Sequence, residues 1–282
     1  MSYLDDSLRR KAIFFTGKGG VGKSTLAWAT ALACQRRGRK VAVVGWQPAG
    51  KPAPPALVDL GIPWLGLDTL TTFKEYALTL IKFERLYDSV LDNRVLRTFV
   101  LAAPGLSDAV IAGKIWELVN RGEYETLLID MPSSGHAKAF FKSPLGLKKI
   151  FKMGFIARDT ERVLNLFQSN DVRLDLVTLP EELPLRECQL LKGELQALHS
   201  FSFGYAHFNQ CLPNFAAFEP TELDRLEGEV ERFARAVSTE HAEQASRMAA
   251  HGLGLPTVKI PRFATAGWKA SVQSTADFLE AL

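Results

Sequence analysis

The sequence has 282 residues, enough for one large domain or two small ones. Hydrophobic residues make up 47% and charged residues 23% of the chain, proportions that exclude wholesale disorder. The formal net charge of +3 is too small for a chain built as a whole to bind nucleic acid, and no apolar run approaches the roughly 20 residues that span a bilayer.

Residues 1–11 carry mixed charge and lack the apolar stretch of a signal peptide, so we expect a cytoplasmic protein. The three cysteines, Cys34, Cys188 and Cys211, lie far apart and form no C-x-x-C pair. This spacing gives no support for a disulfide framework or a zinc site, and it fits a reducing compartment.

The N-terminal part predicts a strand–helix–strand unit. Residues 12–15 form an apolar run typical of a buried strand, and a glycine-rich segment follows at 17–25. Residues 26–37 are rich in Ala and Leu and end at Gly38, as a helix does, and residues 40–45 predict a second strand. Such a unit implies a parallel sheet with a right-handed crossover.

The rest of the chain alternates between predicted helices and strands. Residues 48–63 contain five prolines and are predicted as a loop. Helical periodicity covers residues 71–99, 108–120, 160–168, 185–198 and 221–251, and residues 140–155 form a short basic, apolar segment. Further strands are predicted at 65–67, 126–130, 174–179, 203–208 and 257–260.

The glycine-rich segment matches the phosphate-loop pattern G-x-x-x-x-G-K-[ST] through Gly17, Gly22, Lys23 and Ser24. Glycines allow consecutive backbone N–H groups to converge on phosphate oxygens at a helix N-terminus. Lys23 is predicted to reach the β- and γ-phosphates, and the Ser24 hydroxyl to bind Mg²⁺. The predicted nucleotide-binding residues here are Gly17, Lys18, Gly19, Gly20, Val21, Gly22, Lys23, Ser24 and Thr25.

The predicted fold class is therefore α/β: a P-loop NTPase with a mostly parallel sheet flanked by helices, plus a helical elaboration. We expect a single domain over residues 1–282, with helical inserts at about 69–120 and 138–168.

The extra lysine of the loop, Lys18, points to one branch of these proteins. The form G-K-G-G-V-G-K-[ST] resembles the deviant Walker A motif of the MinD/ParA, nitrogenase iron-protein and ArsA branch. In that branch the early lysine typically reaches the nucleotide of a partner subunit. The resemblance implies a nucleotide-sandwich dimer in which Lys18 acts in catalysis across the interface.

Four further segments resemble ArsA-type ATPases, the family of the arsenite-pump ATPase and of the ATPase that targets tail-anchored proteins. Residues 130–136, D-M-P-S-S-G-H, resemble its switch II motif D-T-A-P-T-G-H, with Met131 departing from the usual threonine. Asp130 ends a predicted strand, where a carboxylate can hold Mg²⁺ through water. Residues 103–106, 177–187 and 209–210 match the family in the same order, so the similarity spans nearly the whole chain.

The switch I segment departs from the family. Where ArsA-type proteins carry a motif resembling D-x-D-P-A-H, this chain reads G-W-Q-P-A-G, and Gln47 occupies the place of the aspartate that orients the attacking water. A glutamine cannot accept a proton as a carboxylate does, although it can position water. Either Gln47 supports slow hydrolysis, or the chain binds ATP and hydrolyses it poorly beside an intact partner subunit.

The adenine side is predicted at two places. Asn209 offers a donor and an acceptor to a purine edge, and it resembles the first residue of the family's adenine-side N-Q pair. Pro261, Arg262 and Phe263 follow the last strand, where the family's late loop covers the base. The alternative, an ordinary junction between a strand and a loop, stays open.

Residues 138–158 contain six basic residues and no acid, interleaved with apolar side chains. One interpretation is an apolar surface with a cationic rim for an acidic or membrane-related partner; the other is a helix that covers the core and exposes its charges. Periodicity favours the second.

We therefore expect an ATP-binding, Mg²⁺-dependent ATPase that switches as a dimer and hydrolyses slowly. The alternative is a catalytically impaired regulatory or scaffolding subunit that acts with a homologous ArsA-like partner, so the dimer is either homomeric or heteromeric. The C-x-x-C zinc clasp of the targeting ATPase is missing, and dispersed cysteines argue against arsenite binding. A protein client on the helical inserts and a membrane contact both stay open, and no nucleic-acid partner is expected.

Overall fold

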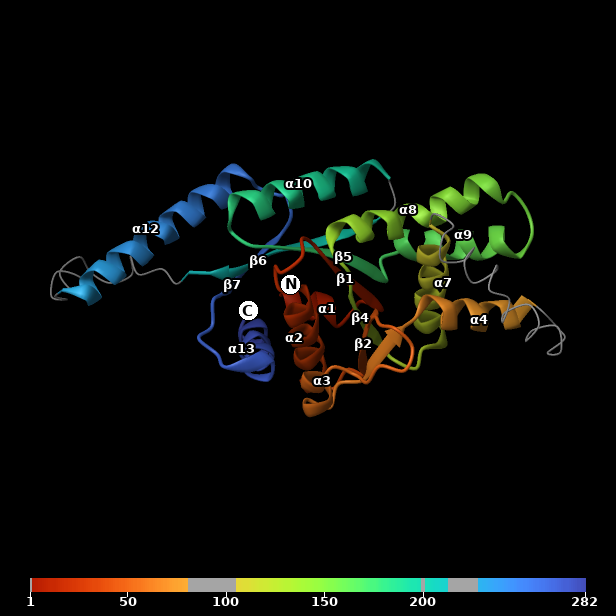
Figure 1. The fold of residues 1–282 in the computed structure, drawn as a ribbon, viewed down its shortest axis with the longest axis horizontal. Coiled ribbons are helices and arrows are strands. Elements are labelled where there is room, and N and C mark those ends of the chain that lie inside the picture. Colours follow the sequence, from red (N-terminus) through yellow and green to blue (C-terminus); the bar gives the residue numbers. More distant parts are fainter. Residues whose placement is uncertain (1, 81–104, 199–200, 213–227) are drawn as a thin grey trace.

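The computed structural model describes residues 2–80, 105–198, 201–212 and 228–282. Its centre is a sheet of seven strands in the order β3-β2-β4-β1-β5-β6-β7 (Figure 1), and every neighbouring pair is parallel. The strands are β1 (Ala12–Thr16), β2 (Val41–Trp46), β3 (Trp64–Leu67), β4 (Thr126–Asp130), β5 (Val172–Thr178), β6 (Phe203–Cys211) and β7 (Thr257–Pro261). The predicted α/β fold with a parallel sheet flanked by helices is confirmed.

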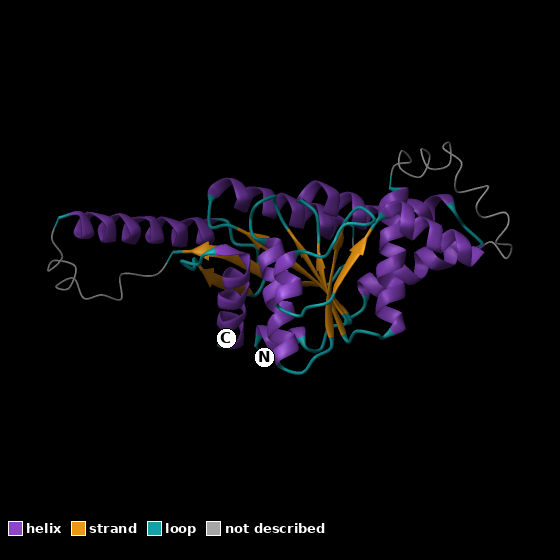
Figure 2. Ribbon diagram, turned by 60° about the horizontal axis from the view of Figure 1, so that its bottom comes forward, coloured by secondary structure: helices purple, strands orange, loops and turns teal. Residues whose placement is uncertain are grey.

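Helices cover both faces of this sheet (Figure 2). One face carries α1 (Tyr3–Ser7), α2 (Lys23–Arg36), α3 (Pro55–Asp59) and α13 (Gly267–Glu280). The other carries α7 (Leu106–Arg121), α8 (Ser134–Ile150), α9 (Phe155–Gln168) and α10 (Glu182–Ala197). Two more helices are α4 (Thr69–Leu80), which packs on α7, and α12 (Glu229–Ala250).

The central strand shows why both faces are covered. Along β1, Ala12 and Phe14 point into one hydrophobic core while Ile13 and Phe15 point into the other, and all four are fully buried. A strand that is buried on both faces has a continuous apolar sequence, and for this reason β1 could be predicted from the sequence. The next residues after β1 are therefore delivered to the carboxyl edge of the sheet, where ligands bind in open α/β folds.

A buried cluster of charges fastens α1 to the sheet beside β1. Arg173 on β5 is 1% exposed and pairs with Asp6 at 2.5 Å and with Asp175 at 2.9 Å. The guanidinium also lies over the rings of Tyr3 and Tyr205, 4.8 Å from each centroid. A charge buried this deeply requires such partners, so α1 is held on β5 and β6 by specific contacts.

One prediction of local structure is wrong, and two other segments contain helices that the sequence did not predict. The segment predicted as a loop contains α3, because Pro55 stands at the first helical position, where a proline costs no hydrogen bond. The segment predicted at 140–155 is the second half of α8, a turn and the start of α9. Helix α13 was not predicted, and it packs against α2.

Two predicted helices lie partly outside the described residues. Of the helix expected at 71–99, α4 accounts for the part up to Leu80. The helix expected at 221–251 is described from Glu229. Among the helices of the described ranges, none is long and apolar enough to cross a membrane.

Candidate functional site

The phosphate loop, Gly17–Thr25, runs from the end of β1 into α2, as the motif predicts. Its two framing glycines are closely packed. A Cβ at Gly17 would lie 2.0 Å from the carbonyl oxygen of Val177 on β5, and Gly22, which caps α2 at a φ of 95°, would place a Cβ 2.1 Å from the Asn209 amide nitrogen. Glycine is required at Gly22 by conformation and at both positions by space.

The glycines between them have open surroundings. A Cβ added to Gly19 or Gly20 would meet no atom within 4 Å, so the loop packs on the protein through its ends and turns its middle outward. Directly after these glycines, the backbone N–H groups of the first turn of α2 have no partner within the helix. An anion placed there gains both these donors and the partial positive charge of the helix N-terminus.

Asn209 braces the phosphate loop. Its side-chain amide donates to the Val21 carbonyl at 2.9 Å, and its oxygen accepts a hydrogen bond from the Gln210 backbone N–H at 3.0 Å. Because these two hydrogen bonds use one N–H and the oxygen of the amide, the predicted contact with adenine would need the second N–H or the second lone pair of the oxygen. Asn209 thus lies beside the phosphate loop through a contact that its sequence position did not predict, and its contact with adenine stays a prediction.

Lys23 is the first residue of α2, and its side chain folds back onto the phosphate loop. Its ammonium donates to the Lys18 carbonyl at 2.9 Å, and the residue is 8% exposed. Burial lowers the pKa of Lys23, while the charge of Asp130 acts in the opposite direction. A buried ammonium near a ring of backbone N–H groups favours an anionic ligand, because the ligand would supply the charge compensation that water no longer gives.

Lys18 pairs within its own chain. Its ammonium contacts the Glu187 carboxylate on α10 at 2.9 Å, and both side chains are about one-third exposed. The residue predicted to reach a partner subunit is therefore held at the surface by a partly solvated ion pair. Such pairs contribute little stability, and they exchange readily for another partner.

Ser24 and Asp130 form a second pair at the mouth of the loop. Asp130 ends β4 next to β1, and its carboxylate is hydrogen-bonded to Ser24. Burial raises the Asp130 pKa to about 6, and the Ser24 hydrogen bond and the Lys23 charge counteract part of this rise. A buried carboxylate beside a hydroxyl oxygen is a donor set that suits Mg²⁺, because the cation prefers oxygen ligands and stabilises the ionised acid.

The switch I segment, Gly45–Gly50, holds Gln47 by both ends of its side-chain amide. The amide nitrogen donates to the Pro52 carbonyl at 2.6 Å, and the amide oxygen accepts a hydrogen bond from the Trp64 indole N–H. The Gln47 backbone N–H also donates to the Leu67 carbonyl at 3.1 Å. In this arrangement Gln47 fastens its loop to β3, with one hydrogen bond at its amide nitrogen and one at its amide oxygen.

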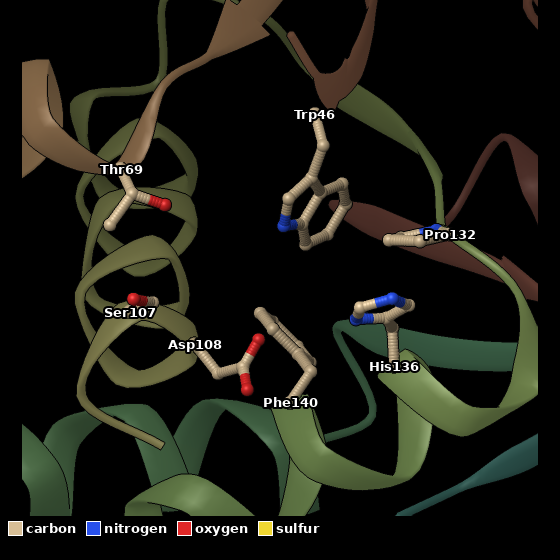
Figure 3. Close-up of a pocket in the computed structure, with 7 residues that line it drawn as sticks. All are labelled: Trp46, Thr69, Ser107, Asp108, Pro132, His136 and Phe140. Carbon is tan, nitrogen blue, oxygen red and sulfur yellow. The ribbon is translucent and has the colours of Figure 1, made fainter. Parts of the chain in front are cut away.

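A cavity of about 320 Å³ lies between the two switches and the helices beyond them (Figure 3). It is lined by Trp46, Thr69, Ser107, Asp108, Pro132, His136 and Phe140. The Asp108 carboxylate and the His136 ring both point into it (Figure 3). Burial raises the Asp108 pKa, and the nearby His136 acts against that rise.

The late loop, Pro261–Phe263, packs on the protein itself. Pro261 lies opposite Cys211 in the β6–β7 pairing, and the Arg262 N–H donates to the Cys211 carbonyl at 2.8 Å. The Phe263 ring packs 6.3 Å from the ring of Phe278 on α13. Their predicted contact with adenine stays a prediction.

The three cysteines are free and buried, as expected for Cys34, which was predicted to be a core residue. Burial raises the pKa of the thiols of Cys34 and Cys188 to about 12 and that of Cys211 to about 11. Thiols with raised pKa values are poor nucleophiles and poor metal ligands.

Sequence reasoning missed two residues of this region. Trp64 was one residue outside a predicted strand, and nothing in its spacing indicated that its indole reaches Gln47. Asp108 was placed on a predicted helix without a role, although it follows the family-like segment at 103–106. The position of Asp108 just after the segment at 103–106 was the signal that could have marked it as a candidate site residue.

The comparisons with known proteins agree with this geometry. The family model described as an anion-transporting ATPase, ArsA_ATPase, matches residues 10–54, the segment that holds the phosphate loop and switch I. The chain is 30% identical over 246 residues to the ATPase BagA of Mycobacterium tuberculosis, covering 77% of this chain and 69% of that protein. The chain belongs to the ArsA-type ATPase family.

Another relative in the same family is more distant. The ASNA1 homolog of Plasmodium falciparum, named as an ATPase, is 22% identical over 225 residues, which cover 74% of this chain and 56% of the relative. Membership in the ArsA-type family makes the chain an ATP-binding ATPase by class, and it accounts for the order of the matching segments along the sequence.

Proposed function

We propose that this ArsA-type ATPase is a Mg²⁺-dependent nucleotide switch that dimerises on ATP and hydrolyses it slowly. The observation that carries the proposal is the contrast at the carboxyl edge of the sheet. The buried ammonium of Lys23 beside the phosphate loop supports nucleotide binding, whereas Gln47, in the place of the family's switch I aspartate, is fastened to Trp64 and Pro52.

ATP binding is assigned to the residues of the phosphate loop. Lys23 would contact the β- and γ-phosphates, the loop N–H groups would surround the phosphate oxygens, and Thr25 lies in the first turn of α2 that follows. The purine edge would be met near Asn209, with Pro261, Arg262 and Phe263 as the second predicted side of the base.

The Mg²⁺ ion is assigned to Ser24 and Asp130. The Ser24 hydroxyl would bind it directly and Asp130 through water, and the bound ion would neutralise charge that develops on the phosphate oxygens. Because the ionised form of Asp130 is disfavoured by burial, metal binding and Asp130 ionisation would support each other.

Slow hydrolysis follows from the chemistry of Gln47. The side chain cannot accept a proton from water at neutral pH, and its hydrogen bonds to Trp64 and Pro52 fix the orientation of the amide, which restricts where it can position water. General-base assistance typically contributes about 10²–10⁴ in rate, so its loss leaves an ATPase that holds ATP for longer.

The dimer is assigned to Lys18. In the single chain Lys18 contacts Glu187 across a partly exposed ion pair, so it exchanges partners at little cost in free energy when a second subunit brings a phosphate group. One domain with helical inserts at about 69–120 and 138–168 and a cytoplasmic location remain part of the proposal.

A second candidate function is a regulatory or scaffolding subunit that binds ATP but depends on a homologous partner for turnover. The doubly fastened amide of Gln47 favours it, because a segment held in this way has no catalytic group of its own. Such a subunit would bind ATP without hydrolysing it until an ArsA-like chain with a switch I aspartate is added.

The test is a single-turnover ATPase measurement with Mg²⁺ on the wild type and on Gln47→Asp, with Gln47→Asn as the matched control. We expect Gln47→Asp to hydrolyse at least about tenfold faster, and Gln47→Asn to stay slow, because only the aspartate restores a proton acceptor. Equal, fast rates in the wild type and Gln47→Asp would contradict slow hydrolysis. A wild-type chain that does not bind ATP would contradict both candidate functions.

A further inference from the structure

The turn between α8 and α9 exposes an unusual set of side chains. Every residue from Lys148 to Phe155 is exposed, and we name this segment the basic apolar turn. Its apolar members include Ile150, Met153 and Phe155, which are 72%, 87% and 64% exposed. Side chains of this size are normally buried, and a group of them on one surface marks an interaction site.

The core does not need these side chains. In the first half of α8, Phe140 and Phe141 are 1% and 0% exposed and pack with Phe14 and Phe167 in the core. The interpretation of residues 138–158 as a helix that covers the core therefore holds for the first half of the segment. The first half covers the sheet, and the second half leaves its apolar groups in water.

The charge around the exposed side chains is positive. Lys148, Lys149 and Lys152 lie within the basic apolar turn, and no acid occurs between residues 138 and 158. The nearest acids that follow are already paired, Asp159 with Arg162 at 3.0 Å and Glu161 with Lys148 at 3.5 Å. Among the described residues, Lys149 and Lys152 have no ion-pair partner.

The basic apolar turn also projects. It lies at the end of the molecule opposite α12, beyond the sheet and away from the phosphate loop (Figure 1). The cavity between the switches is lined by residues outside this turn. A convex tip of this kind presents its side chains to a surface that it can enter, rather than to a helix that would need a groove.

We propose that the basic apolar turn is a docking site for an anionic lipid surface. Ile150, Met153 and Phe155 would enter the boundary between headgroups and acyl chains, while Lys149 and Lys152 contact the lipid phosphates and carboxylates. A second copy of this chain fits less well, because two such turns would bring like charges together. The assignment does not depend on the rate of ATP hydrolysis.

The experiment is vesicle co-sedimentation of the full chain at about 0.1 M salt, where the Debye length is about 10 Å. One set of vesicles is pure phosphatidylcholine, and the other contains about 30% phosphatidylserine as the anionic lipid. We expect binding to the anionic vesicles at least about tenfold tighter than to the neutral ones, and a clear decrease as salt rises.

Two double variants separate the apolar and electrostatic contributions. We expect Met153→Ser with Phe155→Ser to weaken binding to anionic vesicles by about tenfold or more, and Lys149→Glu with Lys152→Glu to weaken it at least as much. The matched control is Val230→Ser with Phe233→Ser on α12, whose side chains are 58% and 68% exposed. This control should bind vesicles as the wild type does, and all three variants should bind ATP normally.

Other outcomes would overturn the assignment. Equal binding to neutral and anionic vesicles, no vesicle binding, or equal losses in the control and in Met153→Ser with Phe155→Ser would each remove the lipid surface as the occupant. Self-association that the Met153→Ser and Phe155→Ser pair abolishes would assign the turn to a second copy. Capture of an acidic or apolar peptide by a chain that ignores vesicles would assign it to a protein.

Discussion

Two loops at the same edge of the sheet behave differently. The phosphate loop after β1 is held by contacts to backbone and to neighbouring strands, through Gly17 on Val177 and Asn209 on Val21. The switch I segment after β2 is held by a side chain, Gln47, whose amide is engaged at both ends. The first loop is held by residues outside it, whereas the second is held by one of its own residues, the glutamine that is predicted to position water.

The difference between the two loops shows which kinds of function can be predicted from a sequence motif. A phosphate loop works mainly through backbone N–H groups and one lysine, so the spacing of its glycines is enough to predict it. Positioning of water works through one side chain and its freedom to move. That freedom depends on partners such as Trp64, which is 17 positions away in the sequence and is brought beside Gln47 by the β2–β3 pairing.

The largest effect is expected from Lys23→Ala. Removing this buried ammonium would delete the proposed charge-assisted contact to phosphate, so we expect ATP binding to weaken by about tenfold to a hundredfold in calorimetric titration. The control is Lys269→Ala, an exposed lysine on α13, which should bind ATP as the wild type does. Equal affinity in the wild type and Lys23→Ala would place the nucleotide elsewhere and remove the contrast between the two loops.

The next effect concerns the brace behind the phosphate loop. Gly22→Ala should destabilise the fold by about 1–3 kcal/mol through its positive φ, and by more because the new Cβ would press on Asn209. Gly20→Ala is the matched control, since Gly20 has a φ of 83° but its Cβ would meet no atom within 4 Å. Thermal unfolding should rank Gly22→Ala below Gly20→Ala.

The contact itself is isolated by adding Asn209→Ala. We expect Gly22→Ala combined with Asn209→Ala to recover part of the lost stability, because the amide no longer meets the Cβ. Additive losses in the double variant would mean that the new Cβ does not press on Asn209.

The sequence predicted the strands well and their connections less well. Continuous apolar runs such as Ile13–Phe15 mark strands buried on both faces, whichever helices cover them. Helix α13 was missed because most of its residues are small or polar, and its burial depends on α2, which is distant in sequence. Helix α3 was missed because its prolines were read as breakers although one of them starts the helix.

The candidate site divides in the same way. Glycine and lysine positions in the phosphate loop follow from a local pattern, and the structure places them together with Asp130. The contacts of Lys18 with Glu187 and of Asn209 with Val21 join residues 169 and 188 positions apart. Spacing carries no information about such pairs, so only the fold could supply them.

A smaller effect is expected at switch I from Trp64→Phe. The substitution keeps an aromatic ring but removes the N–H that holds the Gln47 oxygen. A neutral hydrogen bond contributes about 1 kcal/mol net, so release of Gln47 should raise the single-turnover rate by up to about fivefold without changing ATP affinity. Trp28→Phe is the control, because the Trp28 N–H has no hydrogen-bond partner within the described ranges. An unchanged rate in Trp64→Phe would show that Gln47 limits hydrolysis by its chemistry alone.

The smallest effect is expected from Glu187→Gln. The Lys18–Glu187 pair is about one-third exposed, so removing its charge should change the free energy of unfolding by less than about 1 kcal/mol. The same change frees Lys18 for a partner subunit, and we expect ATP-dependent dimerisation to strengthen by about twofold to fivefold in analytical ultracentrifugation. Glu182→Gln, which removes the exposed partner of Arg186 on the same helix, is the control and should leave dimerisation unchanged. Weaker dimerisation in Glu187→Gln would mean that the carboxylate presents Lys18 to the partner instead of restraining it.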